Sequence, residues 1–178
     1  MRKIISGLFV SLDGVAEAPD TWHFEWFDDE MGAAVGALMA DNHAMLLGRR
    51  QYEEFAAYWP TSDDDFAEIM NGQKKYVVTN TLTEATWNNT EIISGDVMAR
   101  IKALKEEGGK NLGITGSLSL VRSLLTAGLL DELHLMVHPV VVGRGARWFD
   151  GLADVKLELL RSEAFSKGVV NQVYGPVA

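Results

Sequence analysis

The 178-residue chain contains no cysteine. A disulfide framework, a thiolate metal site and a thiol nucleophile are therefore excluded. The absence fits a reducing compartment, so we expect a cytoplasmic protein. No stretch of the sequence approaches the ~20 apolar residues that a membrane-spanning helix needs.

Basic residues are scarce, with 16 Lys and Arg against 25 Asp and Glu and a formal net charge of -9. They are scattered and form no basic stripe, which disfavours nucleic acid as a partner. His134 and His138 lie four positions apart in a segment that reads as a strand, where this spacing spans roughly 13 Å. We therefore expect no metal site. The motifs G-x-S-x-G, Walker A and the complete Rossmann G-x-G-x-x-G are also missing.

The composition, 47% hydrophobic and 23% charged, is that of an ordinary globular protein. The length suits one domain with a full core, so we expect a single domain over residues 1–178. The apolar run near the N-terminus is interrupted by Ser6, Gly7 and Ser11 and runs into Asp13-Gly14. This pattern favours a first strand over a signal peptide.

Apolar runs alternate with helical patterns along the chain. The alternation predicts a mainly parallel sheet with helices on both faces, and a C-terminal hairpin that adds antiparallel strands. We expect strands at 3–12, 43–48, 74–80, 90–93, 110–115 and 131–143, then two strands that meet near Lys167-Gly168. Helical patterns occupy 31–39, 49–59 (one or two turns), 62–72, 96–109 and 116–128.

The expected helices carry recognisable end signals. Asp28 and Asp29 suit the start of the first helix, where the helix dipole favours negative charge. Asp96 is a candidate N-cap, and Gly108 is a candidate residue just past the end of that helix. Ser117 is a candidate N-cap of the last helix.

Ligands of such sheets bind at the carboxyl ends of the strands. Four expected strand ends carry polar residues or glycine, namely 11–14, 48–50, 79–81 and 114–119. In the last of these, Gly116 allows a tight turn, and the helix behind it would direct free N–H groups outward as an anion site. A plain strand-to-helix turn is the alternative interpretation.

Arg49 and Arg50 follow one strand end directly. Arginine can bind a phosphate through two parallel N–H···O hydrogen bonds. Screening over ~8 Å makes the local charge outweigh the net negative charge. The alternative is that the pair forms surface ion pairs with Glu53 and Glu54 at i, i+4 spacing.

The segment 21–27 is rich in aromatic residues. Trp22 and Trp26 are candidates to stack on a flat heterocyclic substrate. They could equally cap the core.

Taken in order, these strand ends resemble the dihydrofolate reductase-like superfamily. The pattern is "SLDG … MLLGRR-YEEF … YVVTNTL … ITGSLSLVRSLLTAGLLDELHLMVHPVVVGRGARWF". The greatest similarity is to the C-terminal reductase domain of the bifunctional riboflavin-biosynthesis enzyme, over nearly the whole chain. The resemblance implies a three-layer α/β fold, a reductase that uses NADPH, and a homodimer.

The resemblance also implies a set of binding residues. Gly48, Arg49 and Arg50 match positions that hold the 2′-phosphate and pyrophosphate of the cofactor. Thr79 and Asn80 match positions beside the adenosine ribose. The pyrophosphate would also meet the helix start formed by Thr115, Gly116, Ser117, Leu118 and Ser119. The nicotinamide end would lie near Leu12, Asp13 and Gly14, with Ile114 beneath it.

The chain departs from its relatives at three points. Gln51 stands where the family usually has threonine. Thr115-Gly116 replaces the Gly-Gly pair, joined by a cis peptide, of dihydrofolate reductase. Dihydrofolate reductase carries a carboxylate on its first helix, but counting back without gaps reaches Gly32 here. Asp28, Asp29 or Glu30 could substitute for it only with an insertion or deletion.

Three functional hypotheses remain from the sequence. The first is hydride transfer from NADPH to a C=N or C=O carbon of a small heterocyclic substrate, most directly the phosphoribosylaminouracil of riboflavin synthesis. Asp13 is the candidate for donating the proton or orienting the substrate, or it is only a turn residue. Arg144 and Arg147 could bind the substrate phosphate, or their loop could stabilise a dimer. The second hypothesis is nucleotide binding without turnover, and the third is dihydrofolate reduction.

Overall fold

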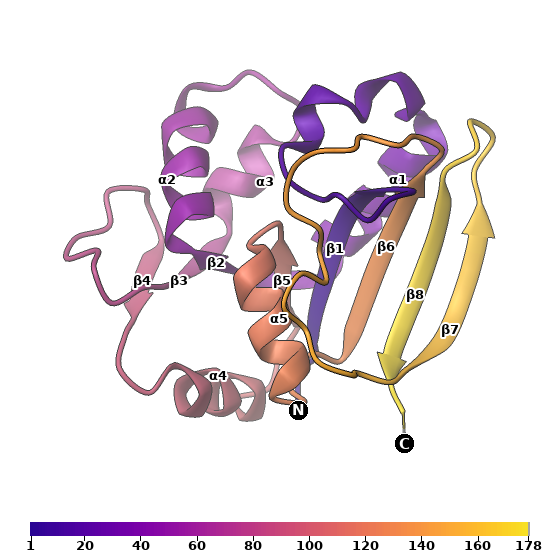
Figure 1. The fold of residues 1–178 in the computed structure, drawn as a ribbon. Coiled ribbons are helices and arrows are strands. Elements are labelled where there is room, and N and C mark those ends of the chain that lie inside the picture. Colours follow the sequence, from indigo (N-terminus) through magenta and orange to yellow (C-terminus); the bar gives the residue numbers. More distant parts are fainter. Residues whose placement is uncertain (178) are drawn as a thin grey trace.

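The computed structural model describes residues 1–177, so Ala178, the last residue of the expected domain, lies outside the described part. Eight strands form one sheet in the order β4-β3-β2-β5-β1-β6-β8-β7 (Figure 1). The first six strands pair in parallel, and β7 and β8 add antiparallel pairs. The expected mixed α/β architecture is confirmed.

The strands are β1 Ile4–Ser11, β2 Asn42–Gly48, β3 Lys74–Val78, β4 Thr90–Ile93, β5 Asn111–Thr115, β6 Glu132–His138, β7 Leu157–Ala164 and β8 Val170–Pro176. The helices are α1 Asp29–Asp41, α2 Arg49–Tyr58, α3 Ala67–Gly72, α4 Val97–Glu106 and α5 Leu118–Thr126. Short 3-10 turns lie at η1 Pro19–Thr21, η2 Phe24–Trp26 and η3 Trp59–Thr61.

Three expected boundaries were wrong. The helix expected at 62–72 begins only at Ala67. The strand expected at 131–143 ends at His138, and residues 139–156 form a long irregular connection to β7 instead. Pro139 begins this connection and cannot donate a ladder hydrogen bond, which agrees with the early end of the strand. The helix after Gly48 spans ten residues rather than one or two turns.

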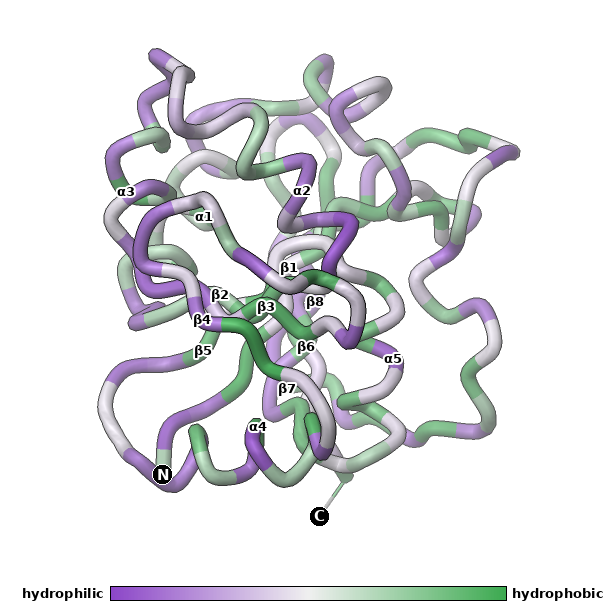
Figure 2. The backbone as a smooth tube through the Cα atoms, turned by 90° about the vertical axis from the view of Figure 1, so that its left-hand side faces the viewer, coloured by the Kyte–Doolittle hydropathy of each residue, from purple (hydrophilic) through white to green (hydrophobic). Residues whose placement is uncertain are grey.

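Helices cover the two faces of the sheet unequally. Ile101 and Leu104 of α4 and Leu124 of α5 pack on one face. Helices α1, α2 and α3 pack on the other face through clusters that include Met31, Tyr52 and Met70. Hydrophobic stretches, green in Figure 2, run mainly through the strands at the centre of the molecule.

The face of the sheet formed by β6, β8 and β7 is different, because α4 and α5 do not reach it (Figure 1). The connection 139–156 runs around its border. Within residues 1–177, no helix is long and apolar enough to cross a lipid bilayer.

Candidate active site

The four polar strand ends meet at one edge of the sheet. Strands β3, β2, β5 and β1 are consecutive neighbours and run parallel. Their carboxyl ends, which carry the segments 79–81, 48–50, 114–119 and 11–14, therefore lie side by side. Pieces of the sequence more than a hundred residues apart thus form one continuous edge.

A direct hydrogen bond joins two of these ends. The backbone N–H of Gly48 donates to Oγ of Ser117 at 2.9 Å. The expectation that the Ser117 side chain caps its own helix was wrong, because its hydroxyl is used for this long-range bond and makes no cap contact. Ser117 adopts a left-handed backbone with φ of 50°, which orients the side chain toward β2.

The helices that follow the segments 48–50 and 114–119 differ from α1 and α4 in their caps. Asp28 accepts from the N–H of Met31 at the start of α1, and Asp96 accepts from Ala99 at the start of α4. Both of these Asp predictions are confirmed. By contrast, no side chain of the described residues caps α2 or α5. Their first-turn N–H groups are therefore free of a side-chain acceptor, as an anion site requires.

The glycine turn after β5 is closely packed. Gly116 has φ of 77°, and a Cβ atom added there would collide with Oε1 of Gln51. No cis peptide bond occurs within residues 1–177, so the Thr115–Gly116 bond is trans. Gln51, where relatives have threonine, thus lies directly against the turn.

Both arginines lie at this edge and form surface ion pairs. Arg49 Nε donates to Glu53 at 2.7 Å, and Arg50 Nε donates to Glu54 at 3.0 Å. The alternative interpretation of these residues as i, i+4 pairs is therefore confirmed. Such pairs contribute only a few tenths of a kcal/mol in ~0.15 M salt, so an anion can displace them.

Each arginine also makes a longer-range contact. Arg49 Nη1 donates to Oγ1 of Thr81 at 2.7 Å, which links the ends of β2 and β3. Arg50 Nη1 lies 3.4 Å from Glu17 Oε1, and its side chain is 78% exposed. The two guanidinium groups therefore border the edge on its solvent side.

The end of β3 is shaped by its own side chains. Thr79 Oγ1 accepts from the N–H groups of Thr81 and Leu82 at 3.1 Å each. Asn80 accepts from the N–H of Gly95 at 3.2 Å, while its side chain stays exposed. These bonds fix an exposed polar turn beside Arg49.

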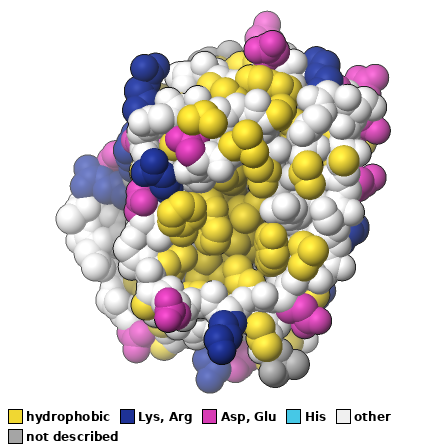
Figure 3. Space-filling view, turned by 45° about the vertical axis from the view of Figure 1, so that its right-hand side comes forward, with side chains coloured by type: hydrophobic (Ala, Val, Ile, Leu, Met, Phe, Trp, Pro, Cys, Tyr) yellow, Lys and Arg dark blue, Asp and Glu magenta, His cyan; other side chains and the backbone are white. Residues whose placement is uncertain are grey.

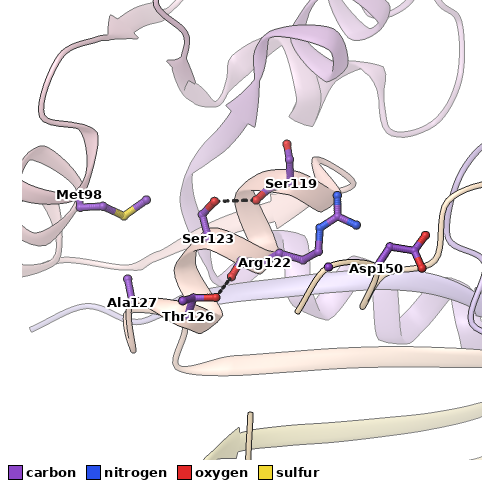
Figure 4. Close-up of a pocket in the computed structure, with 8 residues that line it drawn as sticks. Met98, Ser119, Arg122, Ser123, Thr126, Ala127 and Asp150 are labelled. Carbon is purple, nitrogen blue, oxygen red and sulfur yellow. Dashed lines mark hydrogen bonds between the residues drawn. The ribbon is translucent and has the colours of Figure 1, made fainter. Parts of the chain in front are cut away.

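The remaining residues around α5 divide between core and surface. Ile114 is 1% exposed and belongs to the core, and Leu118 packs against that core. Ser119 is exposed in the first helical turn. It also lines a recess of about 430 Å³ along the outer side of α5 (Figure 4). The Ser123 and Thr126 hydroxyls there donate to carbonyls of their own helix. Arg122 and Asp150 also line the recess.

Asp13 holds the long connection in place. Its Oδ1 accepts from the Ser11 hydroxyl at 2.6 Å and from the N–H of Val142 at 3.0 Å. Its Oδ2 accepts from the N–H of Gly143 at 2.8 Å. These bonds, that of Ser11 first, lower the pKa of Asp13 to about 2. A carboxyl that is ionised and fully engaged in this way is poorly suited to donate a proton near neutral pH.

Glu17 reinforces the same attachment. Its Oε2 accepts from the N–H of Ala146 at 2.8 Å, and Val15 forms an isolated bridge with Arg147. Arg147 Nε donates to the carbonyl of Asp13 at 2.8 Å, so this side chain is engaged within the protein. Gly14 has φ of 84°, and a Cβ atom there would meet the Phe149 ring.

Trp22 and Trp26 pack around two buried histidines. Their rings lie edge-on to His138, with centroids at 5.2 and 6.2 Å. His23 is stacked on Phe9 at 4.6 Å and is 5% exposed. Burial, and secondarily the neighbouring His138, lowers the pKa of His23 to about 4. Both tryptophans therefore cap this end of the core, and each keeps a partly exposed surface.

The start of α1 holds one carboxylate oxygen without a partner, because Asp28 caps the helix through Oδ1 while its Oδ2 is buried and accepts no hydrogen bond from the described residues. Met31 is the fully buried residue there, Asp28 is used as the cap, and Glu30 accepts from the N–H of Ser166. Gly32 has no side chain. The carboxylate of dihydrofolate reductase is thus absent at Gly32, while that of Asp28, four positions earlier, keeps one free oxygen.

Solved structures define the class of fold. The chain superimposes on a putative riboflavin biosynthesis protein from Shewanella sp. PV-4 with a TM-score of 0.79 and 19% identity, covering 99% of both chains. It superimposes on Enterococcus faecalis dihydrofolate reductase complexed with NADP(H) with a TM-score of 0.66 and 14% identity, covering 97% and 95%. The fold is therefore dihydrofolate reductase-like.

Sequence comparison identifies the family. The RibD C-terminal domain family matches residues 2–171, and the chain belongs to it. The protein YyaP of Bacillus subtilis (strain 168) is 32% identical over 181 residues, covering 97% of this chain and 94% of YyaP. The Thermotoga maritima deaminase/5-amino-6-(5-phosphoribosylamino)uracil reductase matches with a TM-score of 0.71 and 16% identity, over 99% of this chain and 57% of that one. Membership of this reductase-like family supports an oxidoreductase of the riboflavin-biosynthesis type.

Three residues at the edge were missed in the sequence-derived set. Thr81 binds Arg49, Gln51 lies against Gly116, and Glu17 joins Arg50 to the long connection. Thr81 belongs to the strand-end segment 79–81, of which only Thr79 and Asn80 were assigned to cofactor binding. No local pattern indicates the contact of Glu17 with Ala146, because 129 positions separate them.

Proposed function

We propose that this protein is an NADPH-dependent reductase of a small heterocyclic substrate, related in reaction type to 5-amino-6-(5-phosphoribosylamino)uracil reductase. The observation that carries the proposal is the convergence of two uncapped helix starts and two exposed arginines on one sheet edge. A dinucleotide phosphate has phosphate groups for each of these features. Membership of the RibD C-terminal domain family supports the same assignment.

The residues present fit such a cofactor. Gly116 takes the left-handed backbone that suits glycine, and Gln51 occupies the place that a side chain there would need. The start of α5 at Leu118 and Ser119 would receive the pyrophosphate. Arg49 and Arg50 would bind the 2′-phosphate, beside the polar turn of Thr79 and Asn80. Leu12 and Gly14 would border the nicotinamide, and Ile114 would lie below it.

When bound, the cofactor supplies the hydride. The protein then has to bind and orient both molecules and to keep water away from them. Trp22 and Trp26 are the proposed surface for a flat substrate. Asp13 would be a positioning residue rather than the proton donor. It would hold the connection 139–156 at the end of β1.

Binding of a phosphate requires that the ion pairs of Arg49 and Arg50 be broken. Glu53 and Glu54 now occupy the guanidinium groups, and the incoming phosphate has to compete with them. A bidentate phosphate contact is stronger than an exposed carboxylate pair, because two parallel charge-assisted bonds form at once. The exchange therefore favours binding.

Titration with NADPH and with NADH, followed by the fluorescence of the five tryptophans, tests the binding step. Candidate pterins, pyrimidines and quinones are then added, and the loss of absorbance of the reduced nicotinamide is followed. We expect NADPH to bind more tightly than NADH and to be consumed with one substrate class. Absence of NADPH binding would contradict the proposal.

One observation favours a second candidate function, nucleotide binding without turnover. The single carboxylate of the 11–14 segment, that of Asp13, is ionised and engaged by three hydrogen bonds. A protein that binds NADPH and reduces no member of the substrate panel would have this second function.

A further inference from the structure

His138, the last residue of β6, is completely buried and keeps one ring nitrogen without a partner. Its exposed fraction is 0%, and its Nδ1 lies 2.8 Å from the carbonyl oxygen of Met136. Because a carbonyl oxygen can only accept, Nδ1 carries the hydrogen of the neutral ring, and Nε2 is an acceptor. No donor within residues 1–177 reaches this Nε2. Buried side-chain nitrogens are normally hydrogen-bonded, so the free acceptor of His138 is exceptional.

His23 lies against the same ring and shares this property. The two imidazole centroids are 6.0 Å apart with their planes at 90°, and Nδ1 of His23 is also buried without a partner in the described chain. Burial lowers the pKa of both histidines below 6.5, that of His23 to about 4. Both rings are therefore neutral at pH 7, and two unpaired ring nitrogens lie in one small cluster.

A short aromatic cover, residues 19–26, separates these nitrogens from solvent. Trp22 and Trp26 contact the His138 ring edge-on, and each keeps a partly exposed surface. Phe24, whose ring centroid lies 4.2 Å from that of His23, is 65% exposed. The cover consists mainly of the three-residue turns η1 and η2, and no side chain of the described residues caps either turn. A flat ring can therefore reach His138 by displacing one aromatic side chain, without opening a helix or a strand.

The pairing of β6 with β1 places His138 beside the proposed nicotinamide end. His138 lies opposite Ser11, the last residue of β1, and the segment 12–14 follows directly. Neighbouring strands are ~4.8 Å apart, so a ring held at His138 would lie next to that segment. His138 shares the face of β6 on which Met136 packs with α1. A substrate bound there would meet the sheet edge from the α1 side.

A hollow of about 550 Å³ lies on the opposite face of the sheet, where Leu135 and Val137 of β6 line it. Figure 3 shows the hollow with its hydrophobic floor. None of the buried, unpaired side-chain atoms of residues 1–177 belongs to its lining. The hollow can take up an apolar ring, but it has no buried, unpaired polar group that would select a ring by its hydrogen bonds.

We propose that Nε2 of His138 accepts a hydrogen bond from a ring N–H of the substrate, and that this acceptor selects an uncharged, flat heterocycle carrying such an N–H. The inference rests on the proposed reductase function and names the substrate class for it. The aromatic rings in contact with His138 are those of Phe9, Trp22, His23 and Trp26, and none of them is charged. A charged substrate ring would lose its hydration among them without gaining a counter-charge. Their aromatic surfaces suit a flat ring.

The unpaired nitrogen makes the selection strong. A ring with an N–H satisfies Nε2 of His138, whereas a ring without one leaves it buried and unpaired. Sites built around such a hydrogen bond reject analogues that lack the donor far more strongly than apolar pockets reject a change of shape. The presence or absence of a ring N–H should therefore decide which heterocycles bind.

Lumazine (pteridine-2,4-dione) and 1,3-dimethyllumazine provide a matched pair of ligands, because the methyl groups replace both ring N–H groups. Calorimetric titration of the protein, alone and with excess NADP⁺, measures their dissociation constants without turnover. We expect lumazine to bind the unmodified chain about 10-fold or more tightly than dimethyllumazine. His138→Phe keeps an aromatic ring but removes the acceptor, so this preference should disappear. His134→Phe, which replaces the other buried histidine of β6, should retain it.

A spectroscopic measurement covers the case in which His138→Phe does not fold. The chain has four histidines, so ¹⁵N labelling of the imidazole rings gives a small set of signals. A new hydrogen bond changes the shielding of an acceptor nitrogen. We expect lumazine to move the Nε2 signal of His138 upfield in the unmodified chain, and dimethyllumazine to leave it nearly unchanged.

The outcomes separate this inference from the proposed function. Absence of lumazine binding, or equal affinity for the two rings as expected for binding in the apolar hollow, would overturn the inference. A preference that persists in His138→Phe would do the same, since it would come from the size of the methyl groups. Absence of NADPH binding beside an intact N–H preference would contradict only the proposed reductase function.

Discussion

The backbone amide of Gly48 and the hydroxyl of Ser117, 69 positions apart, form a 2.9 Å hydrogen bond that joins the ends of β2 and β5. The bond sets the spacing between the two helix starts that would share the cofactor phosphates. It also leaves the N-terminus of α5 without its own side-chain cap. Ser117 therefore supports the shape of the edge rather than the stability of one helix.

Replacing Ser117 with alanine should loosen this edge. The N–H of Gly48 loses its acceptor at a partly buried position, which costs about 1–3 kcal/mol of unfolding free energy. Urea denaturation measures the loss, and NADPH titration should show weaker binding. Ser123→Ala is the control, because that exposed hydroxyl donates only to Ser119 in the same helix. Equal effects of both substitutions would contradict the role of Ser117.

Replacing Gly116 with alanine should disturb both conformation and packing. The left-handed backbone at φ 77° costs a residue with a Cβ atom roughly 1–2 kcal/mol, and the new methyl group would displace Gln51. We expect lower thermal stability and much weaker NADPH binding. Gly36→Ala is a suitable comparison, because this position is within α1 with no atom within 4 Å of the added Cβ. It should raise stability slightly.

Acidification should destabilise the protein through its buried histidines. Burial lowers the pKa of His23 from 6.5 to about 4, and it also lowers the pKa values of His134 and His138. Between pH 6.5 and about pH 4, the unfolded chain binds more protons than the folded chain. The free energy of unfolding therefore falls as the pH drops through this range. The His23 contribution alone amounts to roughly 3 kcal/mol.

Denaturation at pH 7 and pH 4.5 measures this effect. His23→Phe should reduce the loss of stability between the two pH values, since the aromatic stack remains and the titration disappears. His43→Gln, at an exposed position, should leave the loss unchanged. An identical pH dependence of the unmodified chain and His23→Phe would exclude His23 as a source of the acid sensitivity.

Replacing Asp13 with asparagine should release the connection 139–156. Asparagine keeps one acceptor oxygen, so one of the bonds to Val142 or Gly143 is lost. We expect faster hydrogen exchange at these two amides. If Asp13 acts by position, the pH dependence of turnover near neutrality should keep its shape. If the substitution instead removed the rise or the fall of turnover with pH, the proton transfer would be assigned to Asp13.

Local features of the fold could be predicted from the sequence. The caps at Asp28 and Asp96 and the hairpin near Lys167-Gly168 depend on neighbouring residues, so short patterns indicate them. The polar strand ends could be found because parallel strands place their carboxyl ends together. The grouping of Gly48, Thr79 and Thr115 at one edge follows from the strand order.

Contacts between distant segments could not be predicted in this way. Ser117 has the composition of an N-cap, but the nearness of Gly48 in the folded chain gives its hydroxyl another partner. Asp13-Gly14 reads as a turn, and the amides that bind Asp13 come from 129 and 130 positions away. Residues 139–143 are apolar enough for a strand, but Leu12 and Asp13 engage them as a connection instead.

The dissociation constants of NADPH and NADH, measured for the unmodified chain and for Arg49→Ala and Arg50→Ala, test the central claim most directly. We expect either substitution to weaken NADPH binding about 10- to 100-fold, as loss of a charged hydrogen bond predicts, and to change NADH binding far less. Arg100→Ala, which removes a partly exposed, ion-paired arginine of α4, should affect neither. Equal losses for both cofactors, or no NADPH binding at all, would contradict the account.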